Sequence, residues 1–424
     1  SDLALVYSGS NRLAPGHKFA LSPTLSAAWV VSEEEFLRDN NIINFLKLRA
    51  SAGLINADFI PANDYWSQNF GGGNGYPLGN NAAWFGGLQE YSLPTQNIKN
   101  ERAFKYNFGV DAVIANDLTF TGDIFYERRD NIFVSGYYTV SSVLGNYPSY
   151  ANEGIVNSYG FELGADFNKT INDFSYHLGG KFTLAKSEIK EQLEAAKPYD
   201  YMRSTGKPVG QIFGLEAIGF FVDDNDIHNS PSQEFSTVKP GDIKYKDQNN
   251  DGVINDYDVV PIGYNSWIPE MYFSFDAGLE YKGIGFSAAF QGVANYSTML
   301  MTQSIYKPLI NNTTISNYYF ENRWTPETAG SAIYPRLSTL DNDNNYQNST
   351  VWLADASYLK LRNIEIYYKL PKSMLSSINI NKARVYLRGV DLLSFDTIKM
   401  LDPESTGIAF PLTRTINVGL ALDF

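Results

Sequence analysis

The chain has 424 residues and a net charge of −13, from 33 basic and 46 acidic side chains. This balance argues against nucleic-acid binding, which requires basic patches. The absence of cysteine excludes a disulfide framework and thiol chemistry, and no apolar run reaches the length of about 18 residues that a transmembrane helix requires. Aromatic residues make up 15% of the chain, which is typical of membrane-interface girdles and of surfaces that contact sugars or peptides.

The predicted elements are strands separated by turn signals, and we expect about twelve of them. In the segment 102–113, for example, Phe104, Tyr106 and Phe108 alternate with Lys105 and Asn107. Such alternation places apolar and polar side chains on opposite faces of a strand. The predicted strands are 3–7, 19–30, 45–54, 102–113, 118–134, 155–167, 174–187, 269–281, 284–293, 357–370, 383–393 and 412–424.

The last eleven residues, 414–424, alternate most strictly. Ile416, Val418 and Leu420 lie on one face of this segment, and the chain ends on the aromatic Phe424. Bacterial outer-membrane barrels typically end in this way, with an apolar lipid face and a polar lumen face. The segment therefore favours a transmembrane β-barrel.

The connections between the predicted strands alternate in length. The short ones are 114–117, 168–173, 282–283 and 371–382, and the long ones are 55–101, 135–154, 188–268, 294–356 and 395–411. Short turns on one side and long loops on the other are the pattern of outer-membrane barrels, in which the long loops are extracellular.

Charged residues on the polar faces of the strands agree with a wet barrel lumen. These residues are Asp111, Asp123, Glu162, Asp166, Lys181, Asp276 and Glu280. In a soluble β-sandwich the same side chains would point into solvent, and the alternation alone leaves both interpretations open.

The segment 247–258, DQNNDGVINDYD, matches the template of a calcium-binding loop. Oxygen ligands at alternate positions wrap the cation, and Gly252 permits the sharp bend. The predicted ligands are Asp247, Asn249, Asp251, the carbonyl of Val253, and Asp258. An Asp at the last position is shorter than the usual Glu, which weakens the site or admits magnesium. A polar turn without a metal is the alternative. We expect the cation to brace the long extracellular connection 188–268.

A second candidate site lies in the aromatic and amide-rich stretch 63–87. Tyr65, Trp66, Tyr76 and Trp84 are the predicted substrate-facing residues, because aromatic platforms beside amide side chains suit the capture of glycans or peptides. A self-packed loop with its own small core is an equally good interpretation. No catalytic set of residues can be identified, so we expect the chain not to be an enzyme.

Several stretches of the chain, in order, carry a resemblance to a known family. They include NEGIVNSYGFELG at 152–164, PGDIKYKDQNNDGVINDYDVVPIG at 240–263, NRWTPE at 322–327, SYLKLRNIEIYYKLP at 357–371, and RTINVGLALDF at 414–424. The ordered set resembles the SusC/RagA-type TonB-dependent transporters of Bacteroidetes outer membranes. One departure is Val390-Asp391, where the family usually has Gln-Asn.

The resemblance implies that residues 1–424 form about the last 12 of 22 barrel strands, with the plug and the first strands outside this sequence. It also implies active import of oligosaccharides or oligopeptides across the outer membrane, driven through TonB. A SusD-like surface lipoprotein would act as a lid, and transporter–lipoprotein pairs would form dimers in outer-membrane lipid. The alternatives are a secreted or surface β-rich, calcium-binding adhesin that binds glycans, and a passive porin.

Overall fold

The structure is a computed structural model of residues 1–424. It describes all of them except 60–64, 81, 96, 149, 301–306, 311–312, 341, 376–379, 400, 406–409, 411 and 424, and the side chains of 138, 139 and 142. The predicted aromatic end of the chain, Phe424, lies outside the described residues. None of the helices among the residues described is long and apolar enough to cross a membrane.

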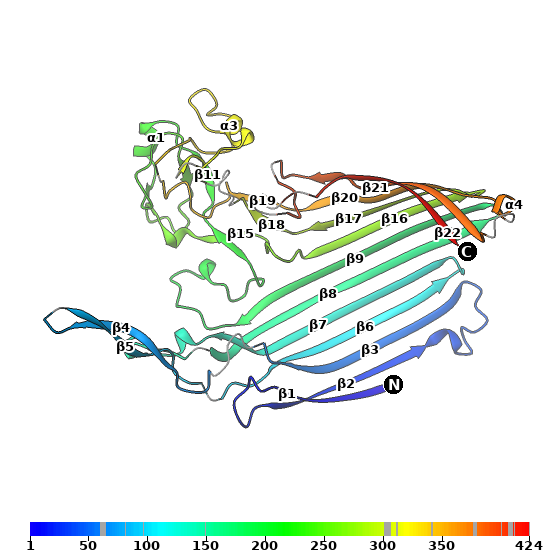
Figure 1. The fold of residues 1–424 in the computed structure, drawn as a ribbon, viewed down its shortest axis with the longest axis horizontal. Helices are drawn as coiled ribbons and strands as arrows, with labels where there is room; N and C mark the ends of the chain where they lie inside the picture. Colours follow the sequence, from blue (N-terminus) through cyan, green and yellow to red (C-terminus); the bar gives the residue numbers. More distant parts are fainter. Residues whose placement is uncertain are drawn as a thin grey trace.

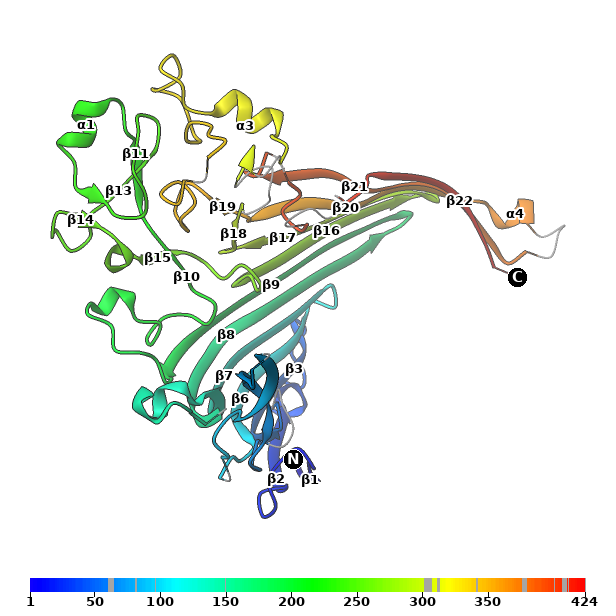
Figure 2. The ribbon, with the colours of Figure 1, turned by 60° about the vertical axis from the view of Figure 1, so that its left-hand side comes forward.

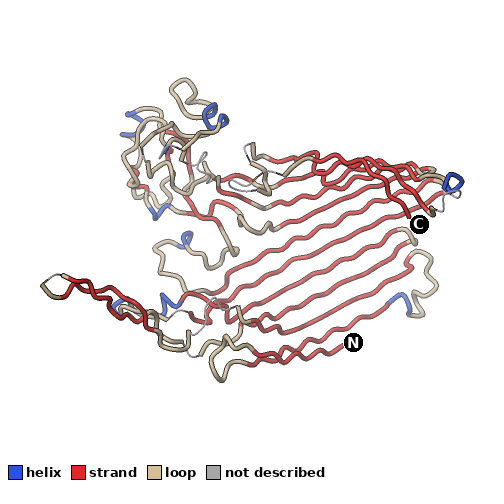
Figure 3. Tube along the Cα trace, in the orientation of Figure 1, coloured by secondary structure: helices blue, strands red, loops and turns tan. Residues whose placement is uncertain are grey.

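Twelve strands form one antiparallel sheet, in the order β1-β2-β3-β6-β7-β8-β9-β16-β17-β20-β21-β22 (Figures 1 and 3). Each strand pairs with the sheet strand before it in the chain, as predicted. The strands are β1 (Asp2–Gly9), β2 (Phe19–Val30), β3 (Ile43–Ala57), β6 (Glu101–Ile114), β7 (Leu118–Ser135), β8 (Tyr150–Ile171), β9 (Phe174–Glu191), β16 (Met271–Tyr281), β17 (Ile284–Ala294), β20 (Tyr358–Lys369), β21 (Lys382–Asp396) and β22 (Thr415–Asp423).

The sheet is strongly curved (Figure 2), and its two faces differ in chemistry. One face is apolar and exposed, as along β22, where Ile416 is 70% and Val418 is 79% exposed. The other face carries ion pairs between strands. Arg49 on β3, for example, bonds Asp111 on β6 at 2.8 Å and Asp123 on β7 at 2.9 Å. This division is what the period of two in the sequence predicts.

The connections are short at one end of the sheet and mostly long at the other (Figure 1). At the short end they are 31–42, 115–117, 172–173, 282–283 and 370–381, and at the long end 10–18, 58–100, 136–149, 192–270, 295–357 and 397–414. Two of the short turns have both central residues in the left-handed region, Ala115-Asn116 and Lys282-Gly283. This geometry suits the twist of a tight hairpin.

Small elements organise the connections. The strand pairs are β4 (Phe70–Leu78) with β5 (Ala83–Glu90), β10 (Ile212–Gly214) with β15 (Val260–Gly263), β11 (Ala217–Phe220) with β13 (Ile243–Tyr245), β12 (Ser232–Gln233) with β14 (Val253–Ile254), and β18 (Ser297–Met299) with β19 (Leu353–Asp355). The α-helices are α1 (Asp224–His228), α3 (Asn317–Asn322) and α4 (Lys372–Leu375). The 3-10 helices are η1 (Val31–Glu33), η2 (Gly136–Thr139), η3 (Ser142–Leu144), η4 (Asp200–Met202) and η5 (Asp256–Asp258).

Candidate functional site

Two long connections, 192–270 and 295–357, pack around one shared hydrophobic cluster, which we call the loop core. Three aromatic rings stack within it: the ring centroids of Tyr319 and Tyr334 are 4.7 Å apart, and those of Tyr334 and Trp352 are 5.8 Å apart. The loop core consists of Leu215, Ile243, Tyr245, Ile254, Leu300, Tyr319, Tyr334 and Trp352. Burial of these large rings makes the two connections one folded unit at the long-connection end of the sheet.

A buried carboxylate, that of Asp242, ties the same two connections together. It is fully buried and accepts hydrogen bonds from the side chain of Arg336 at 3.1 Å and from the amides of Asn342 at 3.0 Å and Asn345 at 2.8 Å. The backbone N–H of Lys239 donates a further bond at 2.7 Å. A charge removed from water requires partners of this kind, and here they come from residues about a hundred positions away in the chain.

A polar cavity of about 540 Å³ adjoins this network. Its lining includes the cationic side chains of Lys239 and Arg336 and the hydroxyl groups of Thr237 and Thr339. Arg336 is held by Asp242, whereas the Lys239 ammonium has no carboxylate partner among the residues described. Cations beside hydroxyl groups can bind a ligand that carries carboxylate or several hydroxyl groups.

The predicted cation loop forms a tight turn that is held by bonds from side chain to backbone. The Asp247 carboxylate accepts from the N–H groups of Asn250 at 2.6 Å and Gly252 at 2.9 Å, and Asp251 accepts from Val253 at 2.8 Å. Asn250 and Gly252 both lie in the left-handed region. The bend that the sequence predicted at Gly252 is present.

The remaining predicted ligands serve the same turn. Asn249 bonds Asp251, with its amide donating to the carboxylate at 2.8 Å. Asp258 is fully buried, and its two oxygens accept from the N–H groups of Gln248 at 2.7 Å and Asn255 at 2.9 Å. In the described part of the chain, no three His, Asp or Glu side chains lie close enough together to hold a metal ion. The predicted ligands also include the amide oxygen of Asn249 and the backbone carbonyl oxygen of Val253. The cation site therefore stays a prediction.

The four predicted substrate-facing aromatic residues fall into two separate pairs. Tyr65 is only 3% exposed and packs with Leu13 and Ile98, and Trp66 lies against its ring edge-on at 5.1 Å. This pair belongs to a small core that also contains residues outside the stretch 63–87. Tyr76 and Trp84 instead lie on the β4–β5 hairpin, where they are 70% and 68% exposed. The structure therefore leaves Tyr76 and Trp84 available to a ligand and buries Tyr65.

The β4–β5 hairpin was not predicted from the sequence, and it reaches out from the long-connection end of the sheet (Figure 1). Six glycines in β4 and β5 interrupt the alternation that identifies a strand. Cross-strand pairs such as Tyr76 with Phe85 and Pro77 with Trp84 are the only sequence signal for it, and they become visible only once the register is known.

A charged cluster at the start of β20 was also missed. The carboxylate of Glu404 accepts hydrogen bonds from Tyr358 at 2.8 Å and Lys360 at 2.7 Å, and also from Arg362. Lys360 is only 3% exposed and also pairs with Asp402 at 2.6 Å. Burial of Glu404 opposes ionisation, but the bonds from Arg362, Lys360 and Tyr358 outweigh it and hold the pKa of Glu404 at about 2. The cluster fixes the connection 397–414 to the sheet.

The seven predicted lumen charges lie on the same, polar face of the sheet, as the register shows. Several of them find partners there. Glu280 accepts from Lys369 and from Tyr367, each at 2.6 Å, and Asp276 bonds His177. The polar face thus carries several ion pairs and hydrogen bonds between strands.

Comparison with family models finds no match. The chain is 24% identical to the TonB-dependent receptor P26 of Formosa agariphila, over 98% of this chain and 43% of that protein. It is also 24% identical to the TonB-dependent receptor SusC of Bacteroides thetaiotaomicron, over 99% of this chain and 41% of that protein. The chain therefore spans less than half the length of these relatives.

Among solved structures, the RagAB peptide transporter matches all of this chain and 45% of its own, with a TM-score of 0.76 and 18% identity. This likeness confirms the predicted fold, an antiparallel outer-membrane β-barrel architecture with long connections at one end. Together with the relatives named above, it also confirms the resemblance to SusC/RagA-type TonB-dependent transporters and the outer-membrane localisation that the sequence predicted.

Proposed function

We propose that this SusC/RagA-type chain forms barrel wall and extracellular loops of an importer that takes up oligosaccharides or oligopeptides and is driven through TonB. The observation that carries the proposal is the twelve-stranded sheet. The chain that forms it is similar over 98% of its length to a TonB-dependent receptor. The ion pairs between strands on the polar face support a wet lumen. The relatives named above are receptors and transporters rather than enzymes.

Uptake by whole cells tests the import. We expect cells that lack the gene to lose uptake of one pool, either labelled oligosaccharides or labelled oligopeptides, and complementation to restore it. An uncoupler that dissipates the inner-membrane proton gradient should abolish this uptake. Uptake that continues in the presence of the uncoupler would instead indicate a passive porin.

A SusD-like surface lipoprotein is the proposed partner, and it would close over the long-connection end. The loop core gives this end a rigid surface on which a lid could rest, and such pairs would form dimers. An affinity-tagged transporter should copurify with one lipoprotein in equal amount. Trp352→Ala should loosen the loop core and reduce the recovered lipoprotein, whereas an exposed change such as Asp224→Ala should leave the ratio unchanged.

For the substrate site we propose Tyr76 and Trp84 on the β4–β5 hairpin. The double variant Tyr76→Ala and Trp84→Ala should weaken ligand binding by at least ten-fold and leave the fold intact, because both side chains are exposed. Tyr65→Ala should instead destabilise the small core, since removing a buried aromatic ring costs about 3–5 kcal/mol. Unchanged affinity in the double variant would refute the proposed site.

We also propose that Asp247, Asn249, Asp251, the Val253 carbonyl and Asp258 bind Ca²⁺, or Mg²⁺, and so brace the connection 192–270. Calorimetric titration of calcium into chelator-treated protein should give a saturable heat, and calcium should protect the connection from protease. Asp247→Asn with Asp251→Asn should abolish both effects. Asp256→Asn, an exposed neighbour that is not a predicted ligand, should abolish neither. No heat with the native protein would rule the site out.

A further inference from the structure

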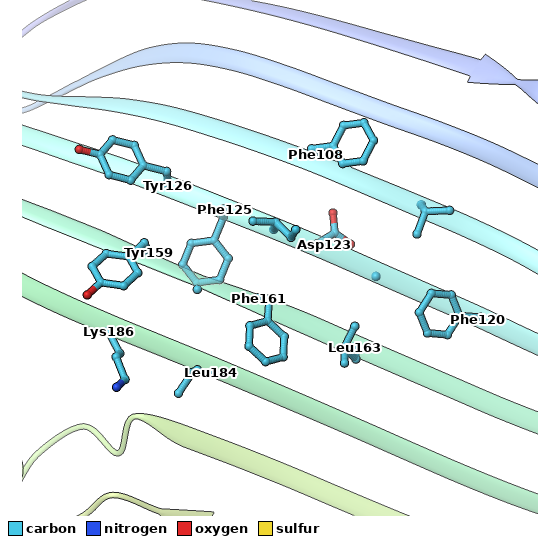
Figure 4. Close-up of a pocket in the computed structure, with 14 residues that line it drawn as sticks. Phe108, Phe120, Asp123, Phe125, Tyr126, Tyr159, Phe161, Leu163, Leu184 and Lys186 are labelled. Carbon is cyan, nitrogen blue, oxygen red and sulfur yellow. The ribbon is translucent and has the colours of Figure 1, made fainter.

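A hollow of about 570 Å³ lies on the apolar face of the sheet, across β6, β7, β8 and β9. Figure 4 shows the rings of Phe108, Phe120 and Phe161 around it. The register places Gly122 directly between Val110 and Leu163, so this row lacks a side chain at its centre. The hollow is therefore a depression that the glycine creates in a surface that otherwise carries large apolar side chains.

One end of the hollow is marked by tyrosines and a lysine. Tyr106, Tyr126, Tyr159 and Lys186 lie directly opposite one another on four successive strands, and Figure 4 shows Lys186 beside Tyr159. Arg128 follows on the same face, one side-chain position beyond Tyr126. Aromatic residues followed by cations are the usual order at the edge of the hydrocarbon layer.

The carboxylates near these two cations are already paired. Glu188 accepts from Lys190 at 2.5 Å, and Asp130 pairs with Arg102 at 2.9 Å. Within the part of the chain that the structure describes, neither Arg128 nor Lys186 has an ion-pair partner. Two uncompensated positive charges thus stand at one end of an apolar depression, and they complement an anion that carries a hydrocarbon chain.

The depth of the hollow agrees with such a ligand. β7 begins at Leu118 at the short-connection end, so Tyr126 is its ninth residue. A tilted strand crosses the hydrocarbon core in about 9–11 residues. The hollow extends along β7 from Phe120, the third residue, to Tyr126, the ninth, and so covers most of such a crossing, while Arg128, the eleventh residue, lies at the level of the lipid head groups on the long-connection side.

We propose that this hollow binds one anionic lipid whose head group carries phosphate, with an acyl chain over Gly122 and the phosphate between Arg128 and Lys186. The acyl chain restores the apolar contacts that the missing side chain leaves unmade. Each cation adds attraction to the phosphate. The proposal requires only that the sheet spans the membrane, and it is independent of the transported substrate.

Native mass spectrometry of the complete protein tests the proposal. The protein is released from nanodiscs made of phosphatidylglycerol or of phosphatidylcholine, and the lipids that remain bound are counted. We expect one retained lipid per barrel, with phosphatidylglycerol retained more strongly than phosphatidylcholine. Arg128→Gln with Lys186→Gln should reduce retention of phosphatidylglycerol at least five-fold and remove the preference. Gly122→Leu should reduce retention of both lipids, because its side chain fills the hollow.

Gly122→Leu should fold, since the atoms nearest to a Cβ there belong to side chains, the Phe120 ring at 3.3 Å and a Val110 methyl at 3.4 Å. Gly180→Leu is its matched control: it adds a side chain to the same apolar face, outside the hollow, where the nearest atom is 4.0 Å away. Lys282→Gln removes an exposed cation at the opposite end of the sheet. Both controls should retain lipid as the native protein does. Equal retention of the two lipids by the native protein, or native retention by Gly122→Leu, would overturn the proposal.

Discussion

At the scale of single residues, backbone conformation and ionisation explain positions that the sequence pattern left open. Asp391 departs from the residue pair usual in the resembling family, yet it lies in the left-handed region with φ of 51° and accepts from Arg362 at 3.0 Å. Asp tolerates this region better than most residues. The role of Asp391 depends on a partner 29 positions away, which no local pattern reveals.

Glu404 gives a prediction about pH. Its folded pKa of about 2 lies below its ordinary value of 4.5, so its stabilising bonds are fully present above about pH 4.5 and are lost as the pH falls towards 2. We expect the protection of the amide hydrogens in the segment 402–405, measured as the exchange rate relative to the intrinsic rate at each pH, to fall over this range. In Glu404→Gln, this protection should already be low at pH 6 and change little on acidification, because the paired charge is gone.

The exposed Glu35→Gln serves as the matched control for that experiment, and it should reproduce the native pH dependence in the segment 402–405. A native protein whose protection from exchange in this segment stays constant down to pH 2 would contradict the assigned role of Glu404.

At the scale of elements, prediction from the sequence was accurate for the strands of the sheet and poor for the connections. Alternation identifies a strand such as β6 because each of its faces meets one environment along its whole length. The connections obey no such rule. Tyr65 and Trp352 are buried by neighbours distant in the chain, and the glycine-rich β4 shows almost no alternation. The candidate site lies in the connections. Its residues could therefore be predicted from the sequence, but not which of them lie close together in space.

The loop core leads to a prediction about Asp242. Asp242→Ala should loosen the two connections that it joins, because it leaves the partly buried Arg336 without its counter-charge and the buried amides of Asn342 and Asn345 without their acceptor. Limited proteolysis should then cut within 215–260 and 315–356 at least ten-fold faster. The exposed Asp224→Ala should keep the native rate, and the strands of the sheet should stay protected in both variants. Native cleavage in Asp242→Ala would show that the network is dispensable.

At the scale of the whole molecule, the arrangement of the sheet separates a barrel from a soluble sandwich. A sandwich needs a second sheet on the apolar face, whereas the other sheets among the described residues are all two-stranded. The apolar face instead exposes residues such as Ile124 at 65% and Val418 at 79%. Soluble monomers rarely expose contiguous apolar surfaces of this extent. A lipid environment removes the free-energy cost of exposing such a surface to water. The order of the strands could be predicted because each one pairs with its neighbour in the chain.

This architecture predicts how the protein migrates on gels. The protein extracted from outer membranes in mild detergent should run faster in sodium dodecyl sulfate before boiling than after it, because a closed antiparallel sheet resists unfolding by the detergent. A soluble protein of the same size, added as a control, should migrate identically in both samples. Identical migration of this protein with and without boiling would favour the adhesin alternative.

The neighbour-to-neighbour pairing of the sheet has a consequence for how the chain tolerates being cut. A nick in the segment 192–198 separates β1–β9 from everything that follows, and the whole loop core then belongs to the second piece. The two pieces remain joined by the eleven residue pairs between β9 and β16. The molecule is thus divisible into two pieces, a wall that carries the β4–β5 hairpin and a wall that carries the loop core.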